Sequence, residues 1–125
     1  MRSFLIVFVG AGLGGALRHG VNLGVVRLMP NGLGVSTLIV NVLGCFMMGL
    51  LVETIALKTG ASNAWRLFLA TGLLGGFTTF SAFSLETAAL YERGQLGWAA
   101  LNVIGSVTLS IAALFAGLYL VRHTA

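Results

Sequence analysis

Four apolar stretches, each long enough to cross a lipid bilayer, occupy most of this chain and limit what it can fold into. They cover residues 3–28, 35–57, 66–91 and 98–121. Because a transmembrane helix needs ~20 apolar residues, a chain of 125 residues holds four such helices and little else. Only 8% of the residues are charged, too few to cover the surface of a soluble domain. The sequence therefore predicts a single all-α integral membrane domain over residues 1–125.

The third stretch departs from a simple transmembrane helix between Thr71 and Glu86. Gly75 and Gly76 are adjacent, and a glycine pair favours a kink or an unwound turn. Unwound backbone at membrane depth is tolerated only where it is buried in protein or lines a polar pathway. We therefore expect the third helix to be broken near the membrane midplane, at the functional centre of a channel or transporter. The side chains that indicate this role are the hydroxyls of Thr78, Thr79, Ser81 and Ser84 and the regularly spaced rings of Phe77, Phe80 and Phe83.

Two polar side chains lie inside the first two stretches. Arg18 shares a helical face with Gly14 and Asn22, and an arginine at this depth normally faces a partner or a watery cavity. It therefore either lines a vestibule or caps backbone carbonyls. Asn41 is the strongly polar group of the second stretch, and its amide either bonds a neighbouring helix or donates to an anion.

The last two stretches carry further polar groups. Glu86 is a proton carrier, a cation ligand or an ordinary interfacial acid. Asn102, Ser106 and Ser110 recur every four residues and form one polar stripe, which either bonds another helix or continues a hydroxyl track with Ser81 and Ser84. Small residues at four-residue spacing in the first stretch predict close helix packing; they are Gly10 with Gly14, and Gly12 with Ala16, Gly20 and Gly24.

Several function classes are excluded or disfavoured. Gly10, Gly12 and Gly15 match G-x-G-x-x-G, but neither the acidic residue nor the α/β pattern of a dinucleotide-binding fold follows. Cys45 is the single cysteine, so no internal disulfide can form. The chain has no aspartate and no nucleophile with a base at helical spacing, so we expect no enzyme. A signal peptide is disfavoured because the apolar character continues past any cleavage point.

The remaining interior chemistry suits a small ion. Amides, hydroxyls and one guanidinium are hydrogen-bond donors, and the edges of phenylalanine rings are electropositive, so together they favour an anion. For Phe80 and Phe83 the alternative interpretation is apolar bulk in the core or against lipid. Free backbone carbonyls at a broken helix would instead hold a cation. Four short helices enclose little, so a pathway would need a second copy of the chain.

Three motifs resemble the Fluc/CrcB family of fluoride channels. They are GGFTTFSAFSLE from Gly75 to Glu86, N-x-x-G from Asn41 to Gly44, and G-x-x-x-R from Gly14 to Arg18. The resemblance covers essentially the whole chain, and the GGxTTFSxFS run is highly specific. It implies an antiparallel, dual-topology homodimer with two pores. Such a dimer exports cytoplasmic fluoride passively across the bacterial inner membrane and gives fluoride resistance.

The resemblance also implies roles for individual residues. Phe80 and Phe83 would be the paired rings whose edges line the pore, Asn41 the pore-lining amide and Arg18 a vestibule arginine. The backbone carbonyls of Gly75 and Thr78 would hold a structural sodium ion at the dimer centre. The other site residues implied are Ser81, Ser84 and Ser110 in a polar track, Thr79 beside them and Glu86 as a pathway acid. Ala82 stands where the family usually has threonine, and Asn102 occupies a position that varies.

Two other functions compete with the fluoride channel. A small four-helix, dual-topology, proton-coupled multidrug exporter needs a membrane-embedded acid, usually in its first helix, where this chain has Arg18 instead. A non-transporting assembly subunit would explain the small-residue stripes but leave GGFTTFSAFS without a purpose. Orientation is only weakly biased, since Arg2, Lys58, Arg66 and Arg122 are expected on one side and Arg27 and Arg93 on the other.

Overall fold

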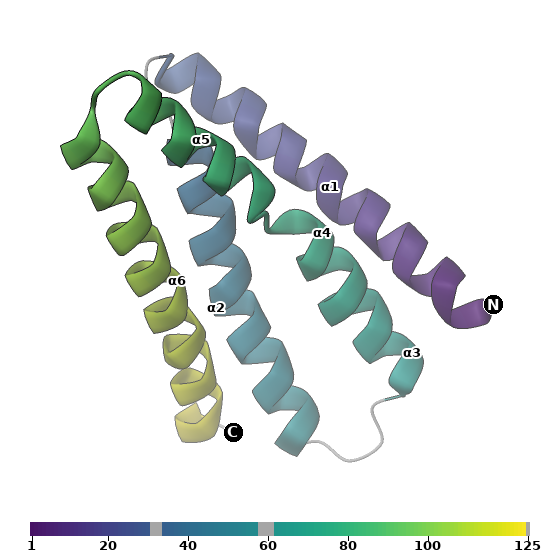
Figure 1. Cartoon of the computed structure of the whole chain (residues 1–125). Helices are drawn as coiled ribbons and strands as arrows, with labels where there is room; N and C mark the ends of the chain where they lie inside the picture. Colours follow the sequence, from purple (N-terminus) through teal and green to yellow (C-terminus); the bar gives the residue numbers. More distant parts are fainter. Residues whose placement is uncertain (31–33, 58–61, 125) are drawn as a thin grey trace.

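The computed structural model describes residues 1–30, 34–57 and 62–124 (Figure 1). Within these ranges the protein is helical and has no strand. The helices are α1 (Arg2–Leu28), α2 (Val35–Leu57), α3 (Asn63–Arg66), the π-helical η1 (Leu67–Leu74), α4 (Gly75–Phe77), α5 (Ser81–Glu92) and α6 (Leu96–Thr124). The segments from α3 to α5 follow one another along a single path, so the described chain has four helical spans long and apolar enough to cross a membrane. The prediction of an all-α membrane fold with four such helices is confirmed.

The third span begins at Asn63, a few residues before the apolar run that marks it in the sequence. Ser62 explains this earlier start, because its hydroxyl accepts the backbone N–H of Trp65 at 3.3 Å and caps the first turn. Both chain termini lie at the end of the bundle where α2 leads toward α3 (Figure 1). At that end Arg122 Nε lies 2.9 Å from Glu53 Oε1 and ties α6 to α2. Lys58, expected on the same side, lies outside the described residues.

The third span changes its packing partner partway along its length. Its first half, η1 and α4, packs against α1, whereas its second half, α5, packs against α6. The fourth span, α6, also makes an extensive interface with α2. The change of partner occurs at residues 78–80, which lie between α4 and α5 and are not helical (Figure 1). Residues 78–80 therefore lie where the third span passes from its contact with α1 to its contact with α6.

Glycines set the close approach of α1 to the third span. A Cβ added at Gly10 would lie 2.7 Å from the carbonyl oxygen of Phe68, and one added at Gly14 would collide with the Leu73 carbonyl. Small residues of this kind let helix backbones touch in a membrane. The predicted packing role of the Gly10 and Gly14 pair is therefore confirmed.

The second small-residue stripe of α1 has a different environment. A Cβ added at Gly12, Gly20 or Gly24 would meet no atom of the described residues within 4 Å. Ala16, on the same face, is exposed. Within the described part of the chain, the glycines of this stripe therefore serve no close helix packing.

The glycine pair of the third span lies within a helix and is not itself unwound. Gly75 and Gly76 both belong to α4, and Gly75 has ordinary helical φ and ψ angles of −62° and −38°. A Cβ on Gly76 would lie 2.5 Å from the Ala11 carbonyl oxygen of α1. Gly76 is therefore a packing position, and the non-helical residues begin at Thr78.

Candidate functional site

The non-helical segment between α4 and α5 begins at Thr78, whose φ of −84° and ψ of 159° are extended. The Thr78 hydroxyl turns back and donates to the Leu74 carbonyl at 3.0 Å. Residues 78–80 therefore leave the helical path for three positions before α5 begins at Ser81. The Thr78 N–H still donates to the Leu74 carbonyl at 3.1 Å, and the Phe80 carbonyl accepts the Ser84 N–H at 2.9 Å. The backbone groups of Thr79 need partners from outside the third span, since unpaired backbone is costly in a membrane.

Asn41 of α2 supplies two of these partners. Its Nδ2 donates to the Thr79 carbonyl at 2.9 Å, and its Oδ1 accepts the Thr79 N–H at 2.8 Å. One side-chain amide thus replaces both backbone partners that a continuous helix would give Thr79. The inter-helix role expected for this asparagine is present, and one N–H of its amide is left over for another acceptor.

Gly44 completes this contact from one turn further along α2. A Cβ at Gly44 would collide with the Thr78 side chain and lie 3.4 Å from a Phe77 ring carbon. Asn41 and Gly44 are three residues apart and share a helical face. The N-x-x-G spacing therefore has a physical meaning: the asparagine bonds the interrupted backbone, and the glycine makes room for it.

A groove of about 300 Å³, hereafter the central groove, lies between α2, α6 and the interrupted segment. It brings together five predicted pore residues: Asn41, Thr79, Phe80, Phe83 and Ser110. The Phe80 and Phe83 ring centroids are 5.5 Å apart with planes at 55°. Phe83 is buried with 7% of its surface exposed, whereas Phe80 is 75% exposed, so one ring forms a wall and the other faces outward. The remaining lining residues are Cys45, Thr78, Ser106, Val107 and Ile111.

Ser106, a member of the predicted polar stripe but not one of the predicted pore residues, lines the central groove and is 6% exposed. The four-residue spacing of Asn102, Ser106 and Ser110 carries the signal that could have found it. Cys45 also lines the groove. Cys45 is four residues after Asn41 and shares its helical face, which agrees with this position.

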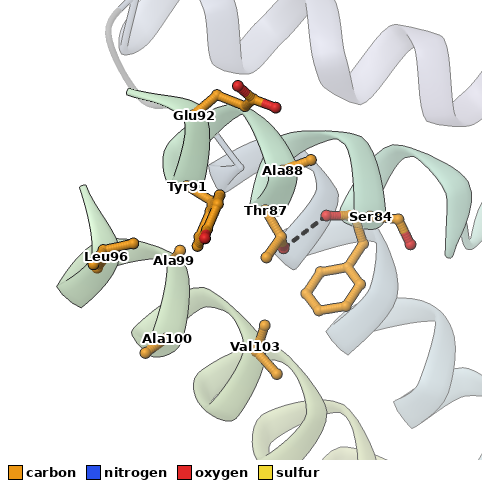
Figure 2. Close-up of a pocket in the computed structure, with 10 residues that line it drawn as sticks. Ser84, Thr87, Ala88, Tyr91, Glu92, Leu96, Ala99, Ala100 and Val103 are labelled. Atoms are coloured by element: carbon orange, nitrogen blue, oxygen red, sulfur yellow. Dashed lines mark hydrogen bonds between the residues drawn. The ribbon is translucent and has the colours of Figure 1, made fainter. Parts of the chain in front are cut away.

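Ser81 and Ser84 lie away from the central groove. The Ser81 hydroxyl is 3.2 Å from the Thr79 hydroxyl and is exposed. Ser84 lines a separate groove of about 590 Å³ between α5 and the start of α6 (Figure 2). Phe83 borders both grooves, so its buried ring separates Ser84 from Ser110.

A third cavity, of about 310 Å³, holds Arg18 and Glu86 between α1, α2 and α5. Glu86 Oε2 accepts the Thr37 hydroxyl at 2.9 Å. The Arg18 Nε and Glu86 Oε1 atoms are buried without a hydrogen-bond partner in the described part of the chain. Thr79 lines this cavity as well as the central groove, so this residue borders both spaces. Ala82 also lines it, at the position where a threonine would add a hydroxyl.

The interruption also frees two backbone carbonyls. In a continuous helix, the Gly75 carbonyl would accept from the N–H of Thr79 and the Thr78 carbonyl from that of Ala82. Instead, Thr79 donates to Asn41 at 2.8 Å, and Ala82 donates to the Thr79 hydroxyl at 3.2 Å. Both carbonyl oxygens therefore leave the helical ladder, and such oxygens are suitable ligands for Na⁺. Among the described residues, no group of three or more His, Cys, Asp or Glu is placed to bind a metal.

Comparison with known proteins places these observations in a family. Residues 5–118 match the family described as CrcB-like protein, Camphor Resistance (CrcB). The chain is 57% identical to a "Fluoride-specific ion channel FluC" of Granulibacter bethesdensis, with 98% of this chain and 96% of that protein covered. It is 55% identical to a protein of the same name from Methylobacterium nodulans, with 98% of each covered. It is 53% identical to "Fluoride-specific ion channel FluC 2" of Nitrobacter hamburgensis, with 97% and 98% covered.

Proposed function

The chain belongs to the CrcB family, and from this membership we propose that it is a fluoride-specific ion channel. Relatives that share more than half of their residues with this chain, over nearly its whole length, carry that name. Four helices able to span a membrane fit a multi-pass membrane protein. A channel is not an enzyme class, and the chain's polar groups are arranged along grooves between helices.

The observation that carries the proposal is the composition of the central groove. Fluoride is small and strongly hydrated, so a pore must replace its water with donors and exclude larger chloride. The side chains that line this groove include the Asn41 amide, the Thr79 and Ser110 hydroxyls and the Phe80 and Phe83 rings, and its described lining contains no carboxylate. Donors and electropositive ring edges favour an anion. We assign fluoride passage to this groove, with Glu86 and Arg18 in a vestibule. Ser81 continues the polar track beside Thr79, and Ser84 continues it in the neighbouring groove across the Phe83 ring.

The pathway needs a second copy of the chain. Phe80 is 75% exposed, so one chain leaves a pore wall open to lipid. The face of Gly12, Gly20 and Gly24 is available for such a contact, since a Cβ added at any of them would meet no described atom of the same chain within 4 Å. The assembly is an antiparallel homodimer of dual topology with two pores, and the weak charge bias between its two ends allows both orientations. The non-helical residues 78–80 then lie near the bilayer midplane of the bacterial inner membrane.

A structural sodium ion fits the carbonyls of Gly75 and Thr78. Both oxygens are released from the helical ladder because Thr79 and Ala82 donate elsewhere. Na⁺ bound to these carbonyl oxygens would hold the interrupted helices of two copies together. Gly75 and Thr78 would bind the ion through their backbone oxygens alone.

Fluoride efflux from liposomes tests the function. Purified protein would be reconstituted in vesicles loaded with fluoride, release followed with a fluoride electrode, and the measurement repeated with chloride. Fast fluoride release with little chloride release is expected. The release should need no proton gradient, because the proposed transport is passive. In the cell, such transport would protect against accumulated fluoride. Well-folded protein that releases no fluoride would refute the proposal. The proton-coupled multidrug exporter is not favoured, since α1 contains no acid.

A further inference from the structure

A chain of hydrogen bonds connects α6 to the backbone of Phe83. The Thr87 hydroxyl donates to the Phe83 carbonyl at 2.9 Å and accepts from Asn102 Nδ2 at 3.0 Å. Asn102 Oδ1 in turn accepts the Ser106 hydroxyl at 3.3 Å. We call these three bonds the Ser106–Phe83 link. In Figure 2 the Thr87 side chain extends from α5 toward α6, and the bond to Phe83 is drawn.

The first turn of α5 depends on such lateral bonds. α5 starts directly after the non-helical residues, and its N-cap residue, Phe80, makes no side-chain capping bond. The bond from the Ala82 N–H to the Thr79 hydroxyl at 3.2 Å ties the start of this turn to residue 79, and the Ser106–Phe83 link ties the same turn to α6. Phe83 lies in it, separates two grooves, and is 7% exposed. A shift of the α5 backbone relative to α6 would move the Phe83 ring against Ser110 and change the width of the central groove.

We propose that Asn102 is a positioning residue that fixes the position of the Phe83 ring through Thr87. It thereby sets the rate of fluoride efflux and the ratio of fluoride to chloride flux. This inference rests on the proposed function. Asn102 is suited to the role because its amide bonds both neighbours at once: the nitrogen donates to α5 and the oxygen accepts from the next turn of α6. Ser106 anchors the amide orientation, so the donor faces Thr87.

Two substitutions break the link at different points. Thr87→Val keeps the shape of the side chain but removes both bonds of the hydroxyl, and Asn102→Leu removes the donor while keeping the branching of the side chain. Thr87→Ser retains the hydroxyl and is the rescue variant. Thr54→Val is the matched control, because the Thr54 hydroxyl makes the same bond to a carbonyl four residues earlier, at 2.6 Å from Leu50, and touches none of the grooves.

Fluoride and chloride efflux would be measured for each variant per amount of folded, reconstituted protein. Thr87→Val and Asn102→Leu are expected to lower fluoride efflux roughly threefold to tenfold, the range set by one to two hydrogen bonds, and to lower the ratio of fluoride to chloride flux. Since both break the same link, the double variant should be no slower than the slower single variant. Thr87→Ser and Thr54→Val should match the wild type in both rate and ratio.

The outcomes separate this inference from the proposed function. A wild-type protein that conducts no fluoride refutes the function itself. A conducting wild type whose Thr87→Val and Asn102→Leu variants keep its rate and its fluoride-to-chloride ratio overturns the positioning role. So does a loss of folded protein with an unchanged rate per folded molecule, because a merely structural link would behave that way. If Thr87→Val does not fold, Asn102→Leu decides alone.

Discussion

Replacing Asn41 with leucine removes both bonds that hold the interrupted segment to α2. The Thr79 N–H and carbonyl, now at 2.8 and 2.9 Å from the amide, would lose their partners. A hydrogen bond between membrane helices contributes ~0.6 kcal/mol on average, whereas an orphaned buried backbone group costs ~1–3 kcal/mol. Thr79 is half-buried and borders two cavities, so water relieves part of this cost.

We therefore expect Asn41→Leu to lower the free energy of unfolding by about 2 kcal/mol, or roughly 30-fold in the ratio of folded to unfolded protein. Fluoride efflux per folded molecule should also fall sharply, because residues 78–80 would lose their fixed position. Unfolding would be followed in detergent by denaturant titration and efflux in liposomes by electrode. Asn22→Leu, at an exposed asparagine of α1, controls for the stability effect of an added leucine.

Asn41→Asp separates the two roles of the amide. The carboxylate can still accept the Thr79 N–H, but its other oxygen faces the Thr79 carbonyl, which is also an acceptor. Stability should fall at neutral pH, and fluoride flux should fall further because a negative charge lies in the central groove. Stability equal to wild type in both Asn41→Leu and Asn41→Asp would refute the backbone-bonding role, even if both variants lost their fluoride flux.

Three further changes test other parts of the structure. Gly14→Ala should lower stability by ~1–3 kcal/mol, because its Cβ would collide with the backbone of the third span. Gly15→Ala is the control: its Cβ would meet no described atom within 4 Å, so the packing of α1 within the chain should stay intact. Thermal unfolding in detergent distinguishes the two variants. Phe83→Leu should reduce fluoride efflux and admit more chloride, since the wall of the central groove loses its ring edge, and paired electrode measurements would show a changed flux ratio. Arg122→Ala should lower stability less than Gly14→Ala does, because the Arg122 side chain is 56% exposed and water screens its pair with Glu53, which is 13% exposed; an equal or larger loss by denaturant titration would contradict this.

The sequence predicts the four helices well because long apolar runs leave no other structure possible in lipid. It places the interruption less well. Gly75 and Gly76 are plausible points for a kink, but their lack of side chains serves contact with α1 instead, and the chain leaves the helix only at Thr78. The Asn41 amide of α2 holds the non-helical segment through the Thr79 backbone. Because every residue has these backbone atoms, the sequence of the third span does not indicate which residue is bound.

Side-chain positions beyond the interruption were also beyond sequence reasoning. The family resemblance groups Ser81 and Ser84 with the phenylalanines, but Phe83 and Ser84 are adjacent in α5, and adjacent helical side chains point ~100° apart. Phe83 consequently lies between Ser84 and the central groove. Arg18 and Glu86 are far apart in the chain and meet in one cavity because α1 and α5 both border α2 there. No local pattern encodes that meeting.

The Asn41 amide links the two parts of the proposed mechanism. By accepting the Thr79 N–H it takes the donor that a continuous helix would give to the Gly75 carbonyl. The same hydrogen bond thus positions residues beside the central groove and frees an oxygen for the proposed sodium site. A change at Asn41 that restores a continuous helix would remove both features together, because the Gly75 oxygen would again accept the Thr79 N–H. The pathway for the anion and the ligands for the cation therefore depend on one interruption of the helix.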